Sequence, residues 1–216
     1  LALELRRRRR IDSRGFRSLP IASSLTDQMR ELLPYRPTKG QEQVLQEIYS
    51  DMEAPGPMCR LLYGDVGSGK TVIAWFSALR AIENGRQALL LAPTELLAEQ
   101  HYERLQPYAD RLGVRAALLS GSSPYTIRQE ITGRIGRGAV DFVVGTHSLI
   151  QKGVTVPRMG LGIIDEQHRF GVNQRTAFIR LSSPAPDGGG VAPEPDLLLM
   201  SATPIPRSFA MALSGD

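Results

Sequence analysis

The sequence predicts an α/β domain with a central, mostly parallel β-sheet and helices on both faces of that sheet. The first observation is an alternation, over residues 41–200, of short apolar runs with stretches whose apolar residues recur at helical spacing. The second is that polar or glycine-rich turns bound these runs, as expected for parallel strands buried on both faces. The composition agrees, because 42% hydrophobic and 22% charged residues in a chain of 216 are typical of one globular domain.

The elements are expected in the following order. A helix is predicted at Gln41–Asp51, where apolar residues recur at helical spacing. Buried strands are predicted at Cys59–Tyr63, Ala88–Leu91, Val114–Leu119, Phe142–Val144, Leu161–Ile164 and Leu197–Met200. Helices are predicted between them at Thr71–Asn84, Leu96–Leu112 and Tyr125–Arg137. The segment Ser182–Pro195 contains four Pro and three Gly, and we expect it to be a flexible loop insertion.

The excess positive charge lies at the N-terminus. Residues 1–20 contain seven Arg and two acidic residues, a net charge of +5, whereas the other 196 residues have a net charge of −1. We interpret residues 1–32 as a basic arm or linker, in which residues 1–5 end one helix. A second helix is expected around Asp27–Leu33, with Thr26 as its cap. The arginine run is either a solvated surface or a contact to duplex phosphates, and the sequence leaves both open.

Several classes of protein are excluded by simple counts. The single cysteine, Cys59, excludes an internal disulfide and with it a disulfide-stapled secreted fold. Apolar runs such as Ala88–Ala92 are far shorter than the roughly 18 residues that a membrane span requires. No apolar stretch follows the Arg-rich start, so it is not a secretory signal. We expect a cytoplasmic protein with no membrane partner and, because residue 1 is Leu, a piece of a longer chain.

A phosphate-binding loop follows the first predicted strand. Its pattern is G-x-x-x-x-G-K-S/T, and its residues are Gly64, Asp65, Val66, Gly67, Ser68, Gly69, Lys70 and Thr71. Glycines let the backbone N–H groups surround phosphates, and the helix that follows adds its positive N-terminus. Lys70 is expected at the β- and γ-phosphates and Thr71 on Mg²⁺. The pattern therefore predicts ATP with Mg²⁺ as the cofactors.

A pair of carboxylates, Asp165 and Glu166, follows the predicted strand Leu161–Ile164. Two carboxylates at the end of a buried strand are costly unless a partner neutralises them, and nucleotide-bound Mg²⁺ is such a partner. We expect Asp165 to hold the metal and Glu166 to orient and deprotonate the attacking water.

Two further segments follow strands. Thr94, in Ala92–Leu97, is either functional or the cap of the next helix, and Ser201–Thr203 is either functional or an ordinary turn.

These motifs, in this order, resemble the first RecA-like motor domain of a superfamily 2 DNA helicase of the RecG type. The matching stretches are Gly64–Thr71, Pro93–His101, Gly145–Gln151, Ile164–Val172 with Gln174 and Arg175, and Ser201–Arg207. The string D-E-Q-H-R-F-G-V is the most specific of them. The resemblance implies a RecA-like P-loop NTPase fold over residues 33–216. It also implies a helicase that couples ATP hydrolysis to translocation on, and unwinding of, branched DNA such as forks and Holliday junctions.

The resemblance also implies roles for individual residues. It makes Lys70, Asp165, Glu166 and His168 catalytic, and places adenine against Tyr35 and Gln41. It implies sequence-independent contacts to the DNA backbone from Pro93, Thr94, Ser120, Gly121, Gly145 and Thr146. It implies coupling of nucleotide state to DNA binding through Gln167, His168, Phe170, Gln174, Arg175, Ser201, Ala202 and Thr203.

The same resemblance implies partners within a longer protein. These are a junction-binding domain before this region and a second RecA-like domain after it, which supplies an arginine finger worth about 10³–10⁵ in rate. We therefore expect this chain alone to bind ATP–Mg²⁺ weakly, to hydrolyse it poorly and not to unwind DNA. The alternatives are a duplex translocase of the transcription-repair coupling type, a small P-loop kinase or nucleotide switch, and a non-catalytic DNA-binding module.

Overall fold

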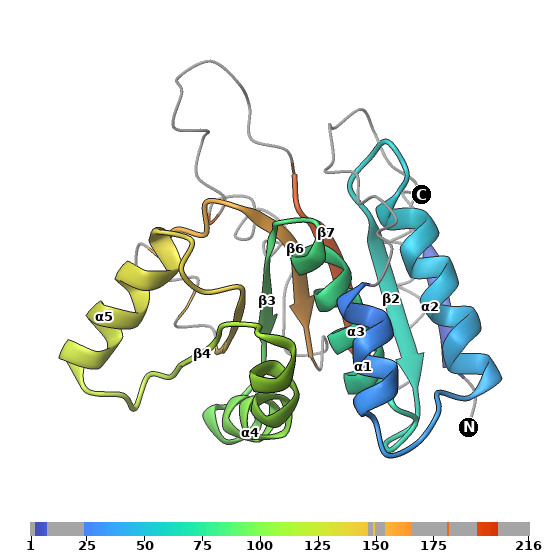
Figure 1. Ribbon diagram of the computed structural model, residues 1–216, viewed down its shortest axis with the longest axis horizontal. Helices are drawn as coiled ribbons and strands as arrows, with labels where there is room; N and C mark the ends of the chain where they lie inside the picture. Colours follow the sequence, from blue (N-terminus) through green and yellow to red (C-terminus); the bar gives the residue numbers. More distant parts are fainter. Residues whose placement is uncertain are drawn as a thin grey trace, which may run out of the picture.

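The computed structural model describes residues 3–7, 24–146, 149, 154–165, 181 and 194–202. These residues form one seven-stranded sheet, in the order β1-β2-β7-β6-β3-β5-β4, and five helices (Figure 1). The strands are β1 (Leu3–Arg7), β2 (Cys59–Gly64), β3 (Gln87–Leu91), β4 (Ala116–Leu119), β5 (Phe142–Gly145), β6 (Met159–Ile164) and β7 (Asp196–Ser201). The helices are α1 (Leu25–Leu32), α2 (Lys39–Met52), α3 (Lys70–Glu83), α4 (Glu95–Leu112) and α5 (Tyr125–Gly136).

Six of the strands, β2 to β7, are parallel, and β1 pairs antiparallel with β2 at one edge. The parallel registers bring the strand ends together: Leu91 of β3 lies beside Gly145 of β5 and Ile164 of β6. The predicted mostly parallel sheet is therefore confirmed. The described residues that directly follow each parallel strand therefore lie at the same edge of the sheet.

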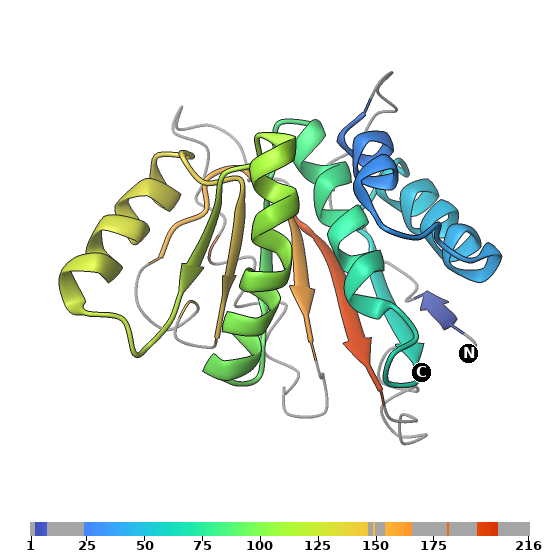
Figure 2. The same cartoon turned by 60° about the horizontal axis from the view of Figure 1, so that its bottom comes forward.

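The sheet is covered on both faces. Neighbouring residues of each buried strand point to opposite sides, so each strand contributes side chains to a core on either face. On one face, Leu90 belongs to a core cluster that also contains residues of α1, α2, α3 and α4, with Phe76 fully buried. On the other face, Leu89 belongs to a second cluster that contains Ile135 of α5. Figure 2 shows α3 and α4 lying across the first face, with α1 and α2 beside them.

The helix boundaries follow from their caps. At α2, Thr38 and Gln41 form a capping box, in which each side chain accepts a hydrogen bond from the backbone of the other. The helix α3 begins one residue earlier than predicted, at Lys70, because Gly69 takes the capping position with a φ of +91°. Val114 is not part of β4 as predicted. Its N–H donates to the carbonyl of Ala109 at 2.9 Å and so closes the C-terminus of α4.

Two expectations for the N-terminal segment are wrong. Residues Leu3–Arg7 form a strand rather than the end of a helix, and their pairing satisfies backbone groups of β2 that would otherwise lie at a sheet edge. The helix α1 starts at Leu25, capped by Ser24 rather than Thr26. Met29 of α1 is fully buried in the main core, so this helix packs against the rest of the domain. Of the predicted loop insertion, residues 182–193 lie outside the described residues.

Candidate functional site

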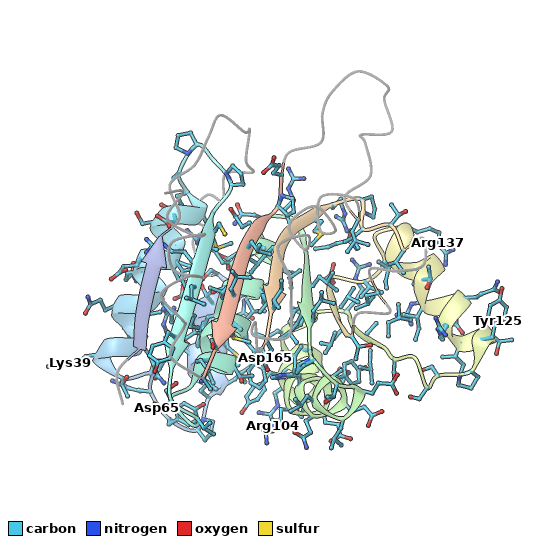
Figure 3. All side chains as sticks on the ribbon, turned by 180° about the vertical axis from the view of Figure 1, so that it is seen from behind. Lys39, Asp65, Arg104, Tyr125, Arg137 and Asp165 are labelled. Carbon is cyan, nitrogen blue, oxygen red and sulfur yellow. The ribbon has the colours of Figure 1, made fainter. Side chains whose placement is uncertain are left out.

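The candidate site residues form a row along the carboxyl edge of the sheet. In spatial order they are the phosphate loop after β2, Ser201 and Ala202 at the end of β7, Asp165 after β6, Pro93 and Thr94 after β3, Gly145 and Thr146 at the end of β5, and Ser120 and Gly121 after β4. Figure 3 shows Asp65 and Asp165 at the same end of the sheet. The phosphate loop therefore lies at one end of the row, the proposed DNA contacts lie at the other, and Asp165 lies between them.

The phosphate loop is shaped by two glycines in the left-handed region, Gly67 with a φ of +80° and Gly69 with a φ of +91°. The Lys70 ammonium group donates to the carbonyl of Gly64 at 2.6 Å and to that of Asp65 at 2.9 Å. The positive charge of Lys70 is thus held against the start of the loop. The hydroxyl of Ser68 is buried and has no hydrogen-bond partner among the described residues. A buried, unpaired hydroxyl at a helix N-terminus suits a bound anion.

Gln41 joins the phosphate loop to α2. Its amide Nε2 donates to the carbonyl of Ser68 at 3.0 Å, and its Oε1 accepts from the backbone N–H of Thr38 at 2.8 Å. The amide lies so close to the loop that a Cβ at Gly69 would overlap Gln41 Nε2. Glycine at position 69 thus suits the φ of the loop, and a side chain there would displace the end of Gln41. The sequence placed Gln41 in the nucleotide site by resemblance, and the structure puts it against the loop.

A cleft of about 830 Å³ opens beside the phosphate loop, between α3 and α4. Its aromatic lining consists of Tyr35, Trp75 and Tyr108, and the Trp75 and Tyr108 rings lie 5.8 Å apart at 46°. Tyr35 is 49% exposed. Its partial burial is the larger of two causes that raise the pKa of its hydroxyl, and the electrostatic effect of Tyr108 is the smaller. Cations also line the cleft, contributed by Lys70, Arg104 and Arg111. A volume in this range, with aromatic and cationic walls, fits a nucleotide.

Asp165 lines the same cleft and is held from two sides. Its backbone N–H donates to the carbonyl of Leu91 at 2.9 Å, and its Oδ2 lies 2.8 Å from Nε2 of His101 on α4. The two side chains are only 16% and 9% exposed, respectively. Asp165 therefore has a defined position in the cleft that Lys70 also lines.

The cleft-lining face of α4 is the part of the site that sequence reasoning missed. His101, Arg104, Tyr108 and Arg111 all line the cleft and recur at intervals of three and four residues, as one helix face does. This spacing was a readable signal. Figure 3 shows Arg104 at the same end of the sheet as Asp165.

The segments proposed to contact DNA lie next to one another. Thr94 caps α4, and its hydroxyl accepts from the backbone N–H of Leu97 at 3.3 Å, so the capping alternative holds whatever else Thr94 does. Ser120 is buried, and its hydroxyl lies 2.7 Å from that of Ser122. A Cβ at Gly121 would lie 2.5 Å from Oε1 of Glu95, which places the β4 end against the start of α4.

Several predicted site residues lie outside the described residues: Glu166, Gln167, His168, Phe170, Gln174, Arg175 and Thr203. Their assigned roles stay predictions. Of the coupling segment after β7, Ser201 is buried and Ala202 lines the cleft. Within the described part of the chain, no three His, Cys, Asp or Glu side chains gather into a metal cluster. None of the helices found there is both long and apolar enough to cross a bilayer.

Comparison with known proteins shows what this chain is similar to. ATP-dependent DNA helicase RecG of Synechocystis sp. is 45% identical over 192 residues, which are 89% of this chain and 22% of that protein. RecG of Streptococcus pneumoniae is 48% identical over 184 residues, 85% of this chain and 26% of that protein. A structure of RecG bound to a three-way DNA junction matches with a TM-score of 0.76 at 39% identity, over 94% of this chain and 26% of that one.

The chain thus spans about a quarter of the length of these relatives. The similarity confirms the RecG-type resemblance and the RecA-like α/β fold. A family model described as DEAD/DEAH box helicase matches residues 38–212. The chain belongs to the DEAD/DEAH box helicase family.

Proposed function

We propose that this chain is the ATP-binding motor domain of a RecG-type helicase, which couples ATP hydrolysis to translocation on and unwinding of branched DNA. The observation that carries the proposal is the cleft that the phosphate loop and Asp165 both line, with Gln41 hydrogen-bonded to the loop. Branched DNA is proposed as the substrate because RecG relatives are similar over most of this chain, and one of them is bound to a three-way junction.

The residues present fit a bound nucleotide. The unpaired hydroxyl of Ser68, the N-terminus of α3 and the ammonium group of Lys70 supply donors for phosphate oxygens. Tyr35 offers an exposed aromatic ring on which adenine can stack. Thr71 and Asp165 would hold Mg²⁺, which, when bound, neutralises phosphate charge and so favours attack at the γ-phosphate.

The remaining roles belong to residues of this chain at the same sheet edge. Glu166 would orient and deprotonate the attacking water, and His168 would link nucleotide state to DNA binding. Hydroxyls and backbone N–H groups near Thr94, Ser120 and Thr146 would contact DNA phosphates. Such contacts suit residues 21–216, whose net charge is −1, because they do not depend on clustered Lys or Arg.

The test is a titration with a fluorescent ATP analogue, with and without Mg²⁺, on the wild-type chain and on Lys70→Ala. We expect Lys70→Ala to weaken binding at least tenfold, the equivalent of about 1.4 kcal/mol. Lys39→Ala is the matched control, because it removes the same charge from an exposed lysine that does not line the cleft. Equal affinity of Lys70→Ala and wild type would refute the phosphate-loop assignment.

A further inference from the structure

We propose that His101 is a positioning residue for the metal site, which holds the carboxylate of Asp165 in the orientation that binds nucleotide-bound Mg²⁺. The inference rests on the proposed function. It assigns a role to a side chain in α4 that lies 64 residues before its partner in the sequence.

The contact restricts Asp165 in the way such a role requires. An aspartate side chain has two rotatable bonds, and its backbone is already held by the hydrogen bond from Asp165 N to Leu91 O. The 2.8 Å contact between His101 Nε2 and Asp165 Oδ2 then sets the rotation of the carboxylate, and so the direction of both oxygens. Both side chains are largely buried, so water competes little for this hydrogen bond.

His101 is itself held in place by α4. Ala98, Leu105 and Ala109 of the same helix are buried in the main core, and Thr94 caps its first turn. The backbone of His101 is therefore held, and its imidazole can follow a turning carboxylate only by leaving its own rotamer. Hydrogen-bond partners of metal-binding carboxylates commonly change metal affinity about 10–100-fold when they are removed. This is the magnitude that we expect for His101.

The experiment measures metal binding separately from nucleotide binding. A fluorescent ADP analogue is titrated into the chain in EDTA and at increasing Mg²⁺, and Mn²⁺ binding to the nucleotide complex is followed by EPR. We expect His101→Leu to need about 10–100 times more metal, with its affinity for metal-free nucleotide within twofold of wild type. His101→Gln, whose amide Nε2 can replace the imidazole donor, should stay within about threefold of wild type in metal affinity.

Two further variants complete the design. His101→Asn is polar but too short to reach Asp165, so it should match His101→Leu, and it replaces that variant if leucine prevents folding. Glu99→Leu is the matched control, because it introduces leucine into the same helix at a position outside the cleft lining.

Two results would contradict the inference. Unchanged metal dependence in both His101→Leu and His101→Asn would overturn the inference. So would an equal loss of affinity for metal-free nucleotide in these variants, with no rescue by His101→Gln, because it would mean that His101 only supports the fold. If the wild-type chain binds nucleotide no better than Lys70→Ala, the proposed function fails first, and this inference fails with it.

Discussion

Replacing Gly69 by alanine tests whether the phosphate loop and α2 are joined through Gln41. The substitution has two separable effects. The φ of +91° at this position costs an L-residue about 1–2 kcal/mol. The new Cβ also overlaps Gln41 Nε2, so that the amide must leave and lose its bonds to Ser68 and Thr38, each worth about 0.5–1.5 kcal/mol. We expect a total loss in free energy of unfolding of about 2–5 kcal/mol.

The control is Gly67→Ala, two residues earlier in the same loop. Gly67 has a φ of +80°, but a Cβ there would meet nothing within 4 Å, so only the backbone cost of about 1–2 kcal/mol applies. Urea denaturation of Gly69→Ala, Gln41→Ala and the double variant completes a double-mutant cycle. In the Gln41→Ala background, the cost of Gly69→Ala should fall to that of Gly67→Ala. Equal costs for the two glycines in the wild-type background would refute the reasoning.

Two other predictions concern the edge of the sheet and the start of a strand. Thr94→Asp keeps a good helix cap, so its free energy of unfolding should stay near that of wild type. Its DNA binding, measured by fluorescence anisotropy, should nevertheless weaken. Thr94→Ala removes the cap and should lose about 1 kcal/mol of stability. Burial raises the pKa of Asp141, but hydrogen bonds from Arg115 outweigh it and lower the value overall. Asp141→Asn should therefore cost about 1 kcal/mol at pH 7, and urea midpoints should converge with wild type as the pH falls below about 4.

The apolar runs made most of the fold predictable. A parallel strand buried on both faces is a nearly continuous apolar run, and runs such as Ala88–Leu91 therefore coincide with strands to within a residue or two. The N-terminal strand gave no such signal. The five residues of β1 include Glu4, Arg6 and Arg7, and only their pairing with β2 makes them a strand. Such pairing depends on a contact some 57 residues along the chain, which local propensity does not report.

The candidate site was predictable where a loop motif follows a strand, and not where a helix face completes it. The phosphate loop and Asp165 follow buried strands, so their position at one sheet edge follows from the α/β pattern. The contact between His101 and Asp165 depends instead on how α4 lies across the sheet. The helical spacing of His101, Arg104 and Tyr108 marks a common face, but it does not say what that face meets.

The pairing of β1 with β2 decides how the arginine run has to be studied. Leu3 pairs with Gly64, the first residue of the phosphate loop, and Arg7 pairs with Arg60. Removing residues 1–20 would expose a row of backbone donors and acceptors on β2, and such an edge promotes aggregation next to the proposed nucleotide site. If the shortened chain lost DNA affinity, the loss could then come from the damaged sheet as well as from the missing positive charge. Exchanging the arginines at positions 8–10 for glutamine removes three charges and leaves Leu3–Arg7 in place.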